Sequence, residues 1–302
     1  MQRLCALALV SSAAAQTWQL VRLGNDAVTA GARCLDGSAG AYYIKAGVGE
    51  NASKFVVFQQ AGGWCMSIED CYSRSQTALG STVSDPATTD SWTIEDLLVG
   101  DAARNPLFYN WTSVYLRYCD GASRASNAAL PATYNSTSLY FRGFPILRAT
   151  IDALLGSSPG DGAPSLAAAT SLVVAGGSAG GLAVFLHADY IAARVRVVNP
   201  GIEMVRAIAS DGFFIDGASI WAGSHDFSAM FERVAALGNI STGDPEQASV
   251  MCEGVGFVSA FLFSQCTGRL TLIAWRLLLQ QSAGIASWQN TPYLGSRRQL
   301  SS

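Results

Sequence analysis

Histidine is nearly absent from this chain, which has two histidines among its 302 residues. Charged side chains are also few, at 14%, and the net charge of −3 is spread along the sequence. Because no basic stripe is present, we expect no nucleic-acid partner. The sequence has no Cys-x-x-Cys pair and no Cys/His cluster at zinc-ligand spacing, so we expect no metal and no cofactor.

Long hydrophobic runs are missing as well. The apolar stretch at residues 270–279 contains Arg276 and is too short to span a bilayer. Residues 1–15 match a secretory signal peptide, in which Arg3 precedes an apolar segment and small residues precede the cleavage site. The alternative for this segment is a short buried helix. We expect a protein without a transmembrane segment that is secreted and is extracellular or in a cell wall.

The cysteines agree with export. Removal of Cys5 with the signal leaves an even number, which favours three disulfides. The remaining six are Cys34, Cys65, Cys71, Cys119, Cys252 and Cys266. Four N-x-S/T motifs are candidate glycosylation sites on surface loops. Their asparagines are Asn51, Asn110, Asn135 and Asn239.

Strand and helix patterns alternate along the chain, which predicts an α/β fold with a mostly parallel sheet and helices on both faces. Strand patterns lie at residues 55–60, 113–120, 171–174 and 204–216, and helical spacing lies at 144–156 and 179–195. Chemistry in such sheets lies where strands end. The Gly-rich turns at 61–63 and 176–181 both follow predicted strands, so we expect them at one rim.

The second turn encloses Ser178 in a G-x-S-x-G sequence, residues 176–180. Between a strand and a helix, this is the nucleophile-elbow pattern. Small flanking residues let the strand and the helix pass closely, so the serine projects from a sharp turn. The helix N-terminus favours negative charge that develops on a substrate. The alternative is an ordinary Gly-rich turn in which Ser178 caps the helix.

Several segments together resemble the pectin acetylesterase family, which includes the Notum-type carboxylesterases. They are residues 34–44, 61–81, 105–123, 139–143, 176–191 and 210–216, in the order that the family has them. The resemblance implies an α/β-hydrolase-like domain over residues 16–266. Gln60 and Ala61 depart from the family, which usually has an acidic residue and a glycine there.

The resemblance also implies roles for matched residues. Ser178 is the nucleophile, and the backbone N–H groups of Gly63, Trp64 and Ala179 form the oxyanion hole, each donor stabilising the transition state by about 3 kcal/mol. The implied disulfides are Cys65–Cys71 and Cys34–Cys119, which leaves Cys252 and Cys266 as the third pair.

A general base and its acid are missing where the family has them. In the family both follow all the matched segments, but residues 245–302 contain no Asp and no His. We expect the hydrolase fold to be C-terminally incomplete, with residues 267–302 as a divergent tail.

Two histidines remain as substitutes. His187 follows Ser178 by nine residues on the same predicted helix, about 13 Å away at 1.5 Å per residue, so we expect a structural role. His225 as base with Asp216 as acid would follow the Ser–Asp–His order of hydrolases. Only eight residues lie between these two, however, which is short for a crossover.

Two functions are compatible with these features. The first is a secreted, monomeric serine carboxylic ester hydrolase that deacetylates a cell-wall polysaccharide such as pectin, or removes a longer acyl chain from a protein. The second is a catalytically dead or truncated relative that binds an acylated glycan or protein. Because a serine needs a base, we expect the chain as given to hydrolyse simple acetyl esters poorly.

Overall fold

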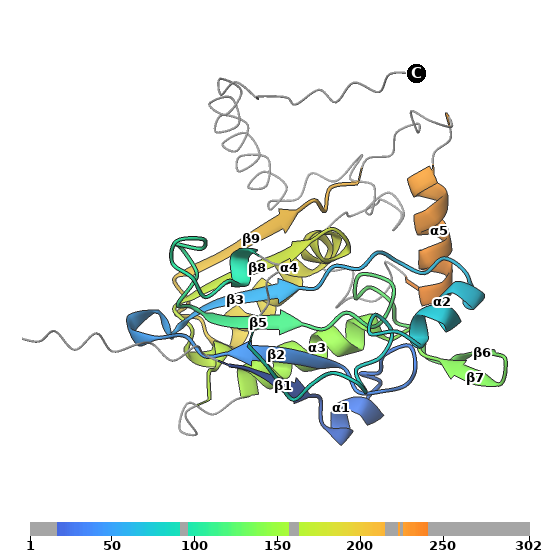
Figure 1. Cartoon of the computed structure of the whole chain (residues 1–302), viewed down its shortest axis with the longest axis horizontal. Coiled ribbons are helices and arrows are strands. Elements are labelled where there is room, and N and C mark those ends of the chain that lie inside the picture. Colours follow the sequence, from blue (N-terminus) through green and yellow to red (C-terminus); the bar gives the residue numbers. More distant parts are fainter. Residues whose placement is uncertain (1–16, 91–95, 157–162, 215–222, 224–225, 241–302) are drawn as a thin grey trace, which may run out of the picture.

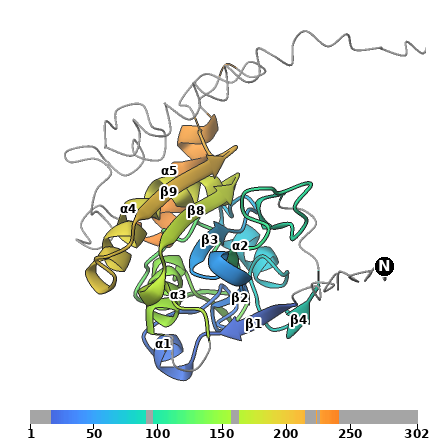
Figure 2. The ribbon, with the colours of Figure 1, turned by 90° about the vertical axis from the view of Figure 1, so that its left-hand side faces the viewer.

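The computed structural model describes residues 17–90, 96–156, 163–214, 223 and 226–240. A seven-stranded sheet forms its centre, in the order β4-β1-β2-β5-β3-β8-β9 (Figures 1 and 2). Its strands are β1 (Trp18–Arg22), β2 (Ala41–Lys45), β3 (Lys54–Gln59), β4 (Thr88–Thr89), β5 (Thr112–Leu116), β8 (Ser171–Gly177) and β9 (Met204–Ser210). A separate hairpin pairs β6 (Ala132–Tyr134) with β7 (Thr137–Leu139).

The helices differ widely in length, and α4 is the longest described. The α-helices are α1 (Asn25–Thr29), α2 (Ile68–Ser75), α3 (Gly143–Gly156), α4 (Ala179–Val198) and α5 (Asp226–Gly238). The short 3₁₀ helices are η1 (Gly49–Asn51), η2 (Asp96–Leu98) and η4 (Leu166–Ala168). Among the described helices, none combines the length and apolarity needed to cross a membrane.

The mostly parallel sheet is confirmed: β5, β3, β8 and β9 run parallel, and β2, β1 and β4 extend the sheet antiparallel. The predicted strands at 55–60, 171–174 and 204–216 correspond to β3, β8 and β9, and both predicted helices form. The strand predicted at 113–120 ends at Leu116. Tyr118 leaves the ladder because its N–H donates to the Gln60 side chain, at 2.8 Å.

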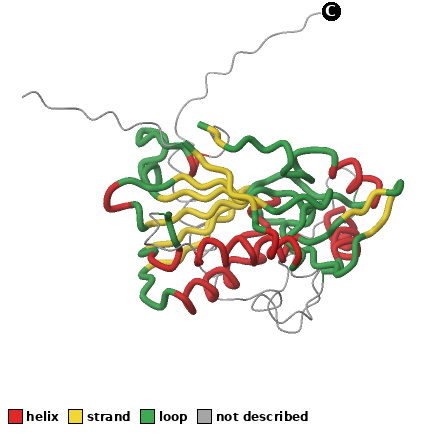
Figure 3. Tube along the Cα trace, turned by 90° about the horizontal axis from the view of Figure 1, so that it is seen from below, coloured by secondary structure: helices red, strands yellow, loops and turns green. Residues whose placement is uncertain are grey.

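Among the described residues, the long helices α3 and α4 cover one face of this sheet and the short helix η2 packs on the other. Phe55 and Val57 of β3 pack in a cluster with α3 and α4, whereas Val56 and Phe58 pack with Leu98 of η2. Figure 2 shows α3 and α4 on the same side of the strands, and Figure 3 shows helices gathered beneath the sheet. In the described residues, the expectation of helices on both faces is therefore met by α3 and α4 on one face and by the short η2 on the other.

The handedness of crossovers explains this difference. The connections from β5 to β8 and from β8 to β9 step in the same direction across the sheet, so right-handed crossovers place α3 and α4 on the same face. The connection from β3 to β5 steps in the opposite direction and therefore crosses the other face. That connection, residues 60–111, packs on the sheet through η2 and loops rather than a long helix.

Gln59 is a polar residue at the end of β3, inside the core. Its side chain is fully buried, and neither amide atom has a hydrogen-bond partner in the described structure. Its neighbours in register are Leu116 of β5 and Gly176 of β8. Each buried polar atom without a partner costs stability.

Replacing Gln59 by leucine removes both unpartnered atoms and keeps the volume. We expect Gln59→Leu to raise the free energy of unfolding by about 1–3 kcal/mol, measured by urea denaturation. The control is Gln19→Leu on β1, whose side chain is exposed; we expect little change there. A Gln59→Leu protein no more stable than the parent would show that the amide is satisfied in solution.

Candidate active site

Ser178 lies between β8 and α4 in a strained backbone conformation. Its φ is 50° and its ψ is −120°, in a region that non-glycine residues rarely adopt. The Ser178 N–H donates to the Ser210 carbonyl at 2.9 Å, and the Ser178 carbonyl accepts from Leu182 N–H at 2.9 Å. Hydrogen bonds on both sides thus hold the strained residue in place.

The Ser178 side chain does not cap the helix. No hydrogen bond joins its hydroxyl to the first turn of α4, so the capping alternative is wrong. The residue is partly exposed, and its hydroxyl has no hydrogen-bond partner in the described part of the chain. The conformation is that of a residue projecting from a sharp turn, as the elbow pattern predicts.

Two glycines allow this turn. A Cβ on Gly176 would overlap the Gly180 carbonyl, and a Cβ on Gly180 would overlap the Gln59 carbonyl. Gly180, in the first turn of α4, lies close against the end of β3, so the elbow and the turn after β3 meet. Because Gln59 pairs with Gly176 in parallel register, both turns leave the sheet at one rim, as predicted.

The turn after β3 presents free backbone donors. Gly62 and Gly63 have φ of 145° and 64°, and a Cβ on Gly63 would face open space. The N–H groups of Gly63 and Trp64 donate to no acceptor that the structure describes. Neither does that of Ala179, which as the first residue of α4 has no partner within the helix. These are the three donors that the resemblance implied.

Ser123 joins the two turns. The Trp64 Nε1–H donates to Ser123 Oγ at 2.8 Å, and Ser123 Oγ lies 2.7 Å from the Ala179 carbonyl. Ser123 has positive φ and is fully buried. The side chain of Ser123 therefore contacts both Trp64 and Ala179.

Aromatic rings extend from Trp64 toward α5. The Trp64 ring packs edge to face with Phe214 and Phe231. Its centroid lies 5.1 Å from that of Phe214 and 5.0 Å from that of Phe231. Phe227 continues the cluster at 5.5 Å from Phe214 and is 43% exposed. This apolar wall flanks the oxyanion turn on the side of α5.

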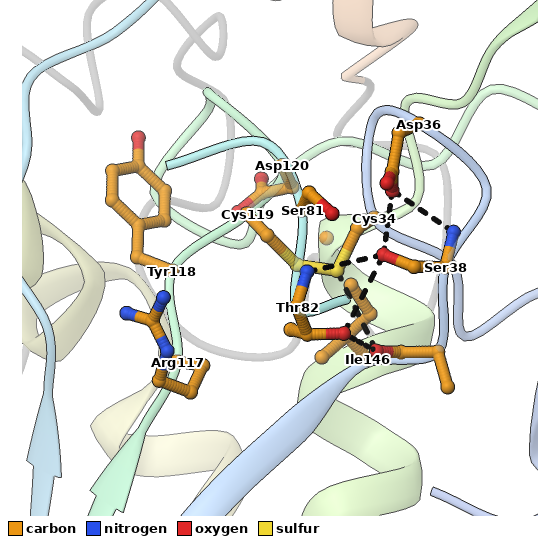
Figure 4. The surroundings of a disulfide bond; sticks show 12 residues. Cys34, Asp36, Ser38, Ser81, Thr82, Arg117, Tyr118, Cys119, Asp120 and Ile146 are labelled. Atoms are coloured by element: carbon orange, nitrogen blue, oxygen red, sulfur yellow. Dashed lines mark hydrogen bonds between the residues drawn. A yellow bond between two sulfur atoms is a disulfide. The ribbon is translucent and has the colours of Figure 1, made fainter. Parts of the chain in front are cut away.

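Two disulfides hold the segments that flank the turn. Cys65–Cys71 lies directly after Trp64, and Cys34–Cys119 joins the N-terminal segment to the chain beyond β5 (Figure 4). Both pairings are those that the resemblance implied.

Gln60, where the family has an acidic residue, lies in a buried ion-pair network. Arg117 binds the Gln60 side-chain oxygen and both carboxylate oxygens of Asp85, the latter at 2.6 and 2.9 Å. The Arg117 and Asp85 side chains are 6% and 7% exposed. Asp85 therefore supplies the buried negative charge that a neutral Gln60 cannot.

His187 has a structural position. Its Nε2 lies 3.2 Å from the Ser123 carbonyl, which requires Nε2 to carry the proton, and its ring packs near Phe144. Burial lowers the pKa of His187 to about 3. An imidazole that is buried, bonded and so weakly basic is not a base for Ser178.

Four predicted residues cannot be compared with the structure. Asp216, His225, Cys252 and Cys266 lie outside the described residues. The structure also describes no group of three or more His, Cys, Asp or Glu side chains able to hold a metal ion.

The candidate glycosylation sites differ in exposure. Asn135, in the turn between β6 and β7, and Asn239 are exposed. Asn51 and Asn110 are half-buried, and the Asn51 amide donates to the Asn110 side-chain oxygen at 3.1 Å. Glycosylation of any of these residues stays a prediction.

A groove of about 770 Å³ lies away from the elbow, along α1, α3 and the C-terminal half of α4. It is lined by Asp26, Arg148, Asp152, Tyr190 and Arg194 among others. The groove is lined by residues of the C-terminal half of α4, whereas Ser178 precedes the N-terminus of that helix. The groove is therefore not part of the candidate site.

Sequence reasoning missed Tyr118 and Ser123 as contributors to the site. Tyr118 Oη donates to the Gly63 carbonyl at 2.7 Å and accepts from Ser123 N–H at 3.0 Å. Both residues lie in the matched segment 105–123, but the strand pattern at 113–120 predicted Tyr118 only as a strand residue. The available signal was the polar residues Asp120 and Ser123 soon after a buried strand.

The parallel sheet and the strained serine at a strand-to-helix turn define the α/β-hydrolase class. Within it, the chain belongs to the pectin acetylesterase family: residues 11–270 match the family described as Pectinacetylesterase. The resemblance drawn from the sequence is thereby confirmed.

Individual relatives agree. Pectin acetylesterase 7 of Arabidopsis thaliana is 34% identical over 211 residues, which cover 70% of this chain and 50% of that protein. Palmitoleoyl-protein carboxylesterase NOTUM of Homo sapiens is 31% identical over 187 residues, 61% of this chain and 34% of that protein. The chain spans about half the length of the pectin acetylesterases that it matches.

A solved structure supports the fold. The Wnt deacylase Notum from Drosophila superposes with a TM-score of 0.58 at 24% identity, covering 74% of this chain and 61% of that one. The α/β-hydrolase-like fold class is confirmed.

The close contact at Gly180 gives a first test of the site. A methyl group there collides with backbone, which cannot move aside, so we expect Gly180→Ala to destabilise the protein by about 1–3 kcal/mol or more. The control is Gly24→Ala, where a Cβ meets nothing within 4 Å. Equal unfolding free energies for the two variants, by urea denaturation, would refute the close approach of α4 to β3.

His187 gives a pH-dependent test. Because the folded-state pKa is about 3 and the unfolded value is near 6.5, the unfolded state binds an extra proton between these values. Stability from this group is complete above pH 6.5 and falls by about 1.4 kcal/mol per pH unit below it. We expect His187→Gln to flatten the stability profile between pH 6.5 and 4. An unchanged slope would show that His187 is not buried as a neutral ring.

Proposed function

We propose that this chain is a secreted carboxylic ester hydrolase that uses Ser178 to remove acetyl groups from a cell-wall polysaccharide such as pectin. The observation that carries the proposal is the backbone of Ser178, held at positive φ with a hydroxyl that has no partner in the described chain. A strained conformation of this kind persists where function requires it. The names of the plant relatives, pectin acetylesterases, support the substrate class.

The chemistry follows from this geometry. Ser178 Oγ attacks the ester carbonyl carbon and gives up its proton to a base, and the carbonyl oxygen becomes an oxyanion. The free N–H groups of Gly63, Trp64 and Ala179 are the proposed donors to that oxygen. Collapse expels the sugar hydroxyl and leaves an acyl group on Ser178, which water then removes as acetate. The N-terminus of α4 favours the negative charge at this point.

The base and its acid are the remaining parts of the proposal. We retain His225 as candidate base and Asp216 as candidate acid, since His187 is committed to the Ser123 carbonyl. The order Ser178, Asp216, His225 is that of the hydrolase class.

A second candidate function is binding without turnover. His187 is hydrogen-bonded to the Ser123 carbonyl and is not a base for Ser178, and no other histidine lies among the residues that the structure describes. This observation favours binding without turnover. The aromatic wall of Trp64, Phe214 and Phe231 would then bind an acylated glycan or an acylated protein. Relatives named as palmitoleoyl-protein carboxylesterases support an acylated protein as a ligand of this family.

A fluorophosphonate probe separates the two functions, since it labels activated serines. For the esterase we expect labelling of the 302-residue chain that Ser178→Ala abolishes. If His225 is the base, His225→Ala reduces the rate by about 10³-fold or more. Hydrolysis of 4-nitrophenyl acetate, which we expect to be slow in the parent chain, should follow the same order across the variants.

Each of the other outcomes would refute one part of the proposal. Labelling that is lost in Ser178→Ala but unaffected by His225→Ala would refute His225 as base. Labelling of the parent no faster than that of Ser178→Ala would refute the esterase and favour binding without turnover.

A further inference from the structure

The proposed oxyanion donors come from two segments far apart in the sequence. Gly63 and Trp64 follow β3, and Ala179 begins α4, more than a hundred residues later. Donors of this kind act by being fixed before the reaction, because reorientation during the reaction costs free energy. Something must therefore hold the two segments in register at the rim.

Ser123 contacts both segments through one hydroxyl. Trp64 Nε1–H can only donate, so it occupies a lone pair of Ser123 Oγ at 2.8 Å. The hydroxyl has a single proton, and the Ala179 carbonyl at 2.7 Å can only accept it. Both bonds are therefore made at once, with their directions fixed. Any shift between Trp64 and Ala179 breaks one of them.

A second connection aims the donor at Trp64. Tyr118 Oη donates to the Gly63 carbonyl at 2.7 Å and accepts from Ser123 N–H at 3.0 Å. The Gly63 carbonyl and the Trp64 N–H belong to one planar trans peptide and point in opposite directions. Holding the carbonyl against Tyr118 therefore directs the Trp64 N–H away from the core. Burial raises the pKa of Tyr118, so the phenol keeps the proton that it donates.

The surroundings hold Ser123 rigidly. Ser123 and Arg124 have φ of 50° and 60°, and both are buried. The Asp120 carboxylate accepts from the N–H groups of Ala122 and Arg124 and from the Ser126 hydroxyl. This loop begins at Cys119, which the disulfide anchors. A loop so constrained can position its neighbours.

We propose that Ser123 is a positioning residue that fixes the N–H groups of Trp64 and Ala179 relative to each other for an oxyanion on the substrate. Its hydroxyl joins the side chain of one donor segment to the backbone of the other, and its own N–H holds Tyr118 against Gly63. The inference rests on the proposed function of Ser178 as nucleophile.

The experiment compares Ser123→Ala with two further variants in the full chain. Tyr118→Phe removes only the hydroxyl that binds Gly63. Ser113→Ala is the matched control: Ser113 is also fully buried with one hydrogen bond to a carbonyl, but it lies at the opposite end of β5. The readouts are the rate of fluorophosphonate labelling at Ser178, kcat and KM for 4-nitrophenyl acetate, and the thermal midpoint.

We expect Ser123→Ala and Tyr118→Phe each to slow labelling about ten- to a hundredfold, below the effect of deleting a donor. The loss should appear in kcat with KM nearly unchanged, because the oxyanion exists only in the transition state. Ser113→Ala should lower the thermal midpoint without slowing labelling.

Three outcomes would overturn the inference. If Ser123→Ala fails to fold, Tyr118→Phe decides it, and full labelling in Tyr118→Phe refutes the positioning role. Losses that track the thermal midpoint equally in all three variants would show a purely structural residue. A parent that labels no faster than Ser178→Ala refutes the proposed function itself, and this inference with it.

Discussion

The close approach of α4 to the ends of β3 and β8 is the constraint on which the site depends. Gly180 lies against the Gln59 carbonyl, and Gly176 lies against the Gly180 carbonyl, with no room for a Cβ at either position. This approach forces the chain to reverse within a single residue, and Ser178 adopts positive φ as a result. The partly exposed Ser178 side chain, the free N–H of Ala179 and the nearness of the second turn are consequences of the same contact.

Most of the elbow could be predicted because its determinants are local. Small residues at fixed offsets from Ser178, an apolar strand before it and helical spacing after it are all visible in one short segment. Strands β3 and β8 are largely apolar runs in which nearly every residue is buried, which is typical of central parallel strands. The edge strand β9 contains the exposed Arg206 and is only partly buried. The two disulfides beside the turn came from the family resemblance rather than from spacing.

The rest of the fold depends on contacts that local patterns do not encode. Strands β1, β2 and β4 have five residues or fewer, and their pairing is set by partners elsewhere in the chain. The roles of Tyr118 and Ser123 depend on hydrogen bonds across 55 and 56 residues. The sparse cover on one sheet face follows from the direction in which β3 connects to β5, which requires the strand order.

Behind the oxyanion turn the core is polar and rich in arginine. The buried side-chain atoms without a described partner all belong to Gln59, Arg74 and Arg124. Arg74 and Arg124 lie 5.0 and 5.5 Å from the Tyr118 ring centroid, and Asp120 offsets part of their charge. Burial lowers the pKa of Arg124 to about 10, which still leaves it charged at neutral pH.

Such an interior costs stability, since buried cations and unpaired amides are less favourable than apolar side chains. In the proposed esterase this charged core lies next to the turn that carries the donors to an oxyanion. Tyr118 links the two: its ring lies against the guanidinium groups, and its hydroxyl binds the Gly63 carbonyl. The polar core and the strained Ser178 backbone therefore both lower the stability of the folded protein, and both lie where the charge of the reaction would develop.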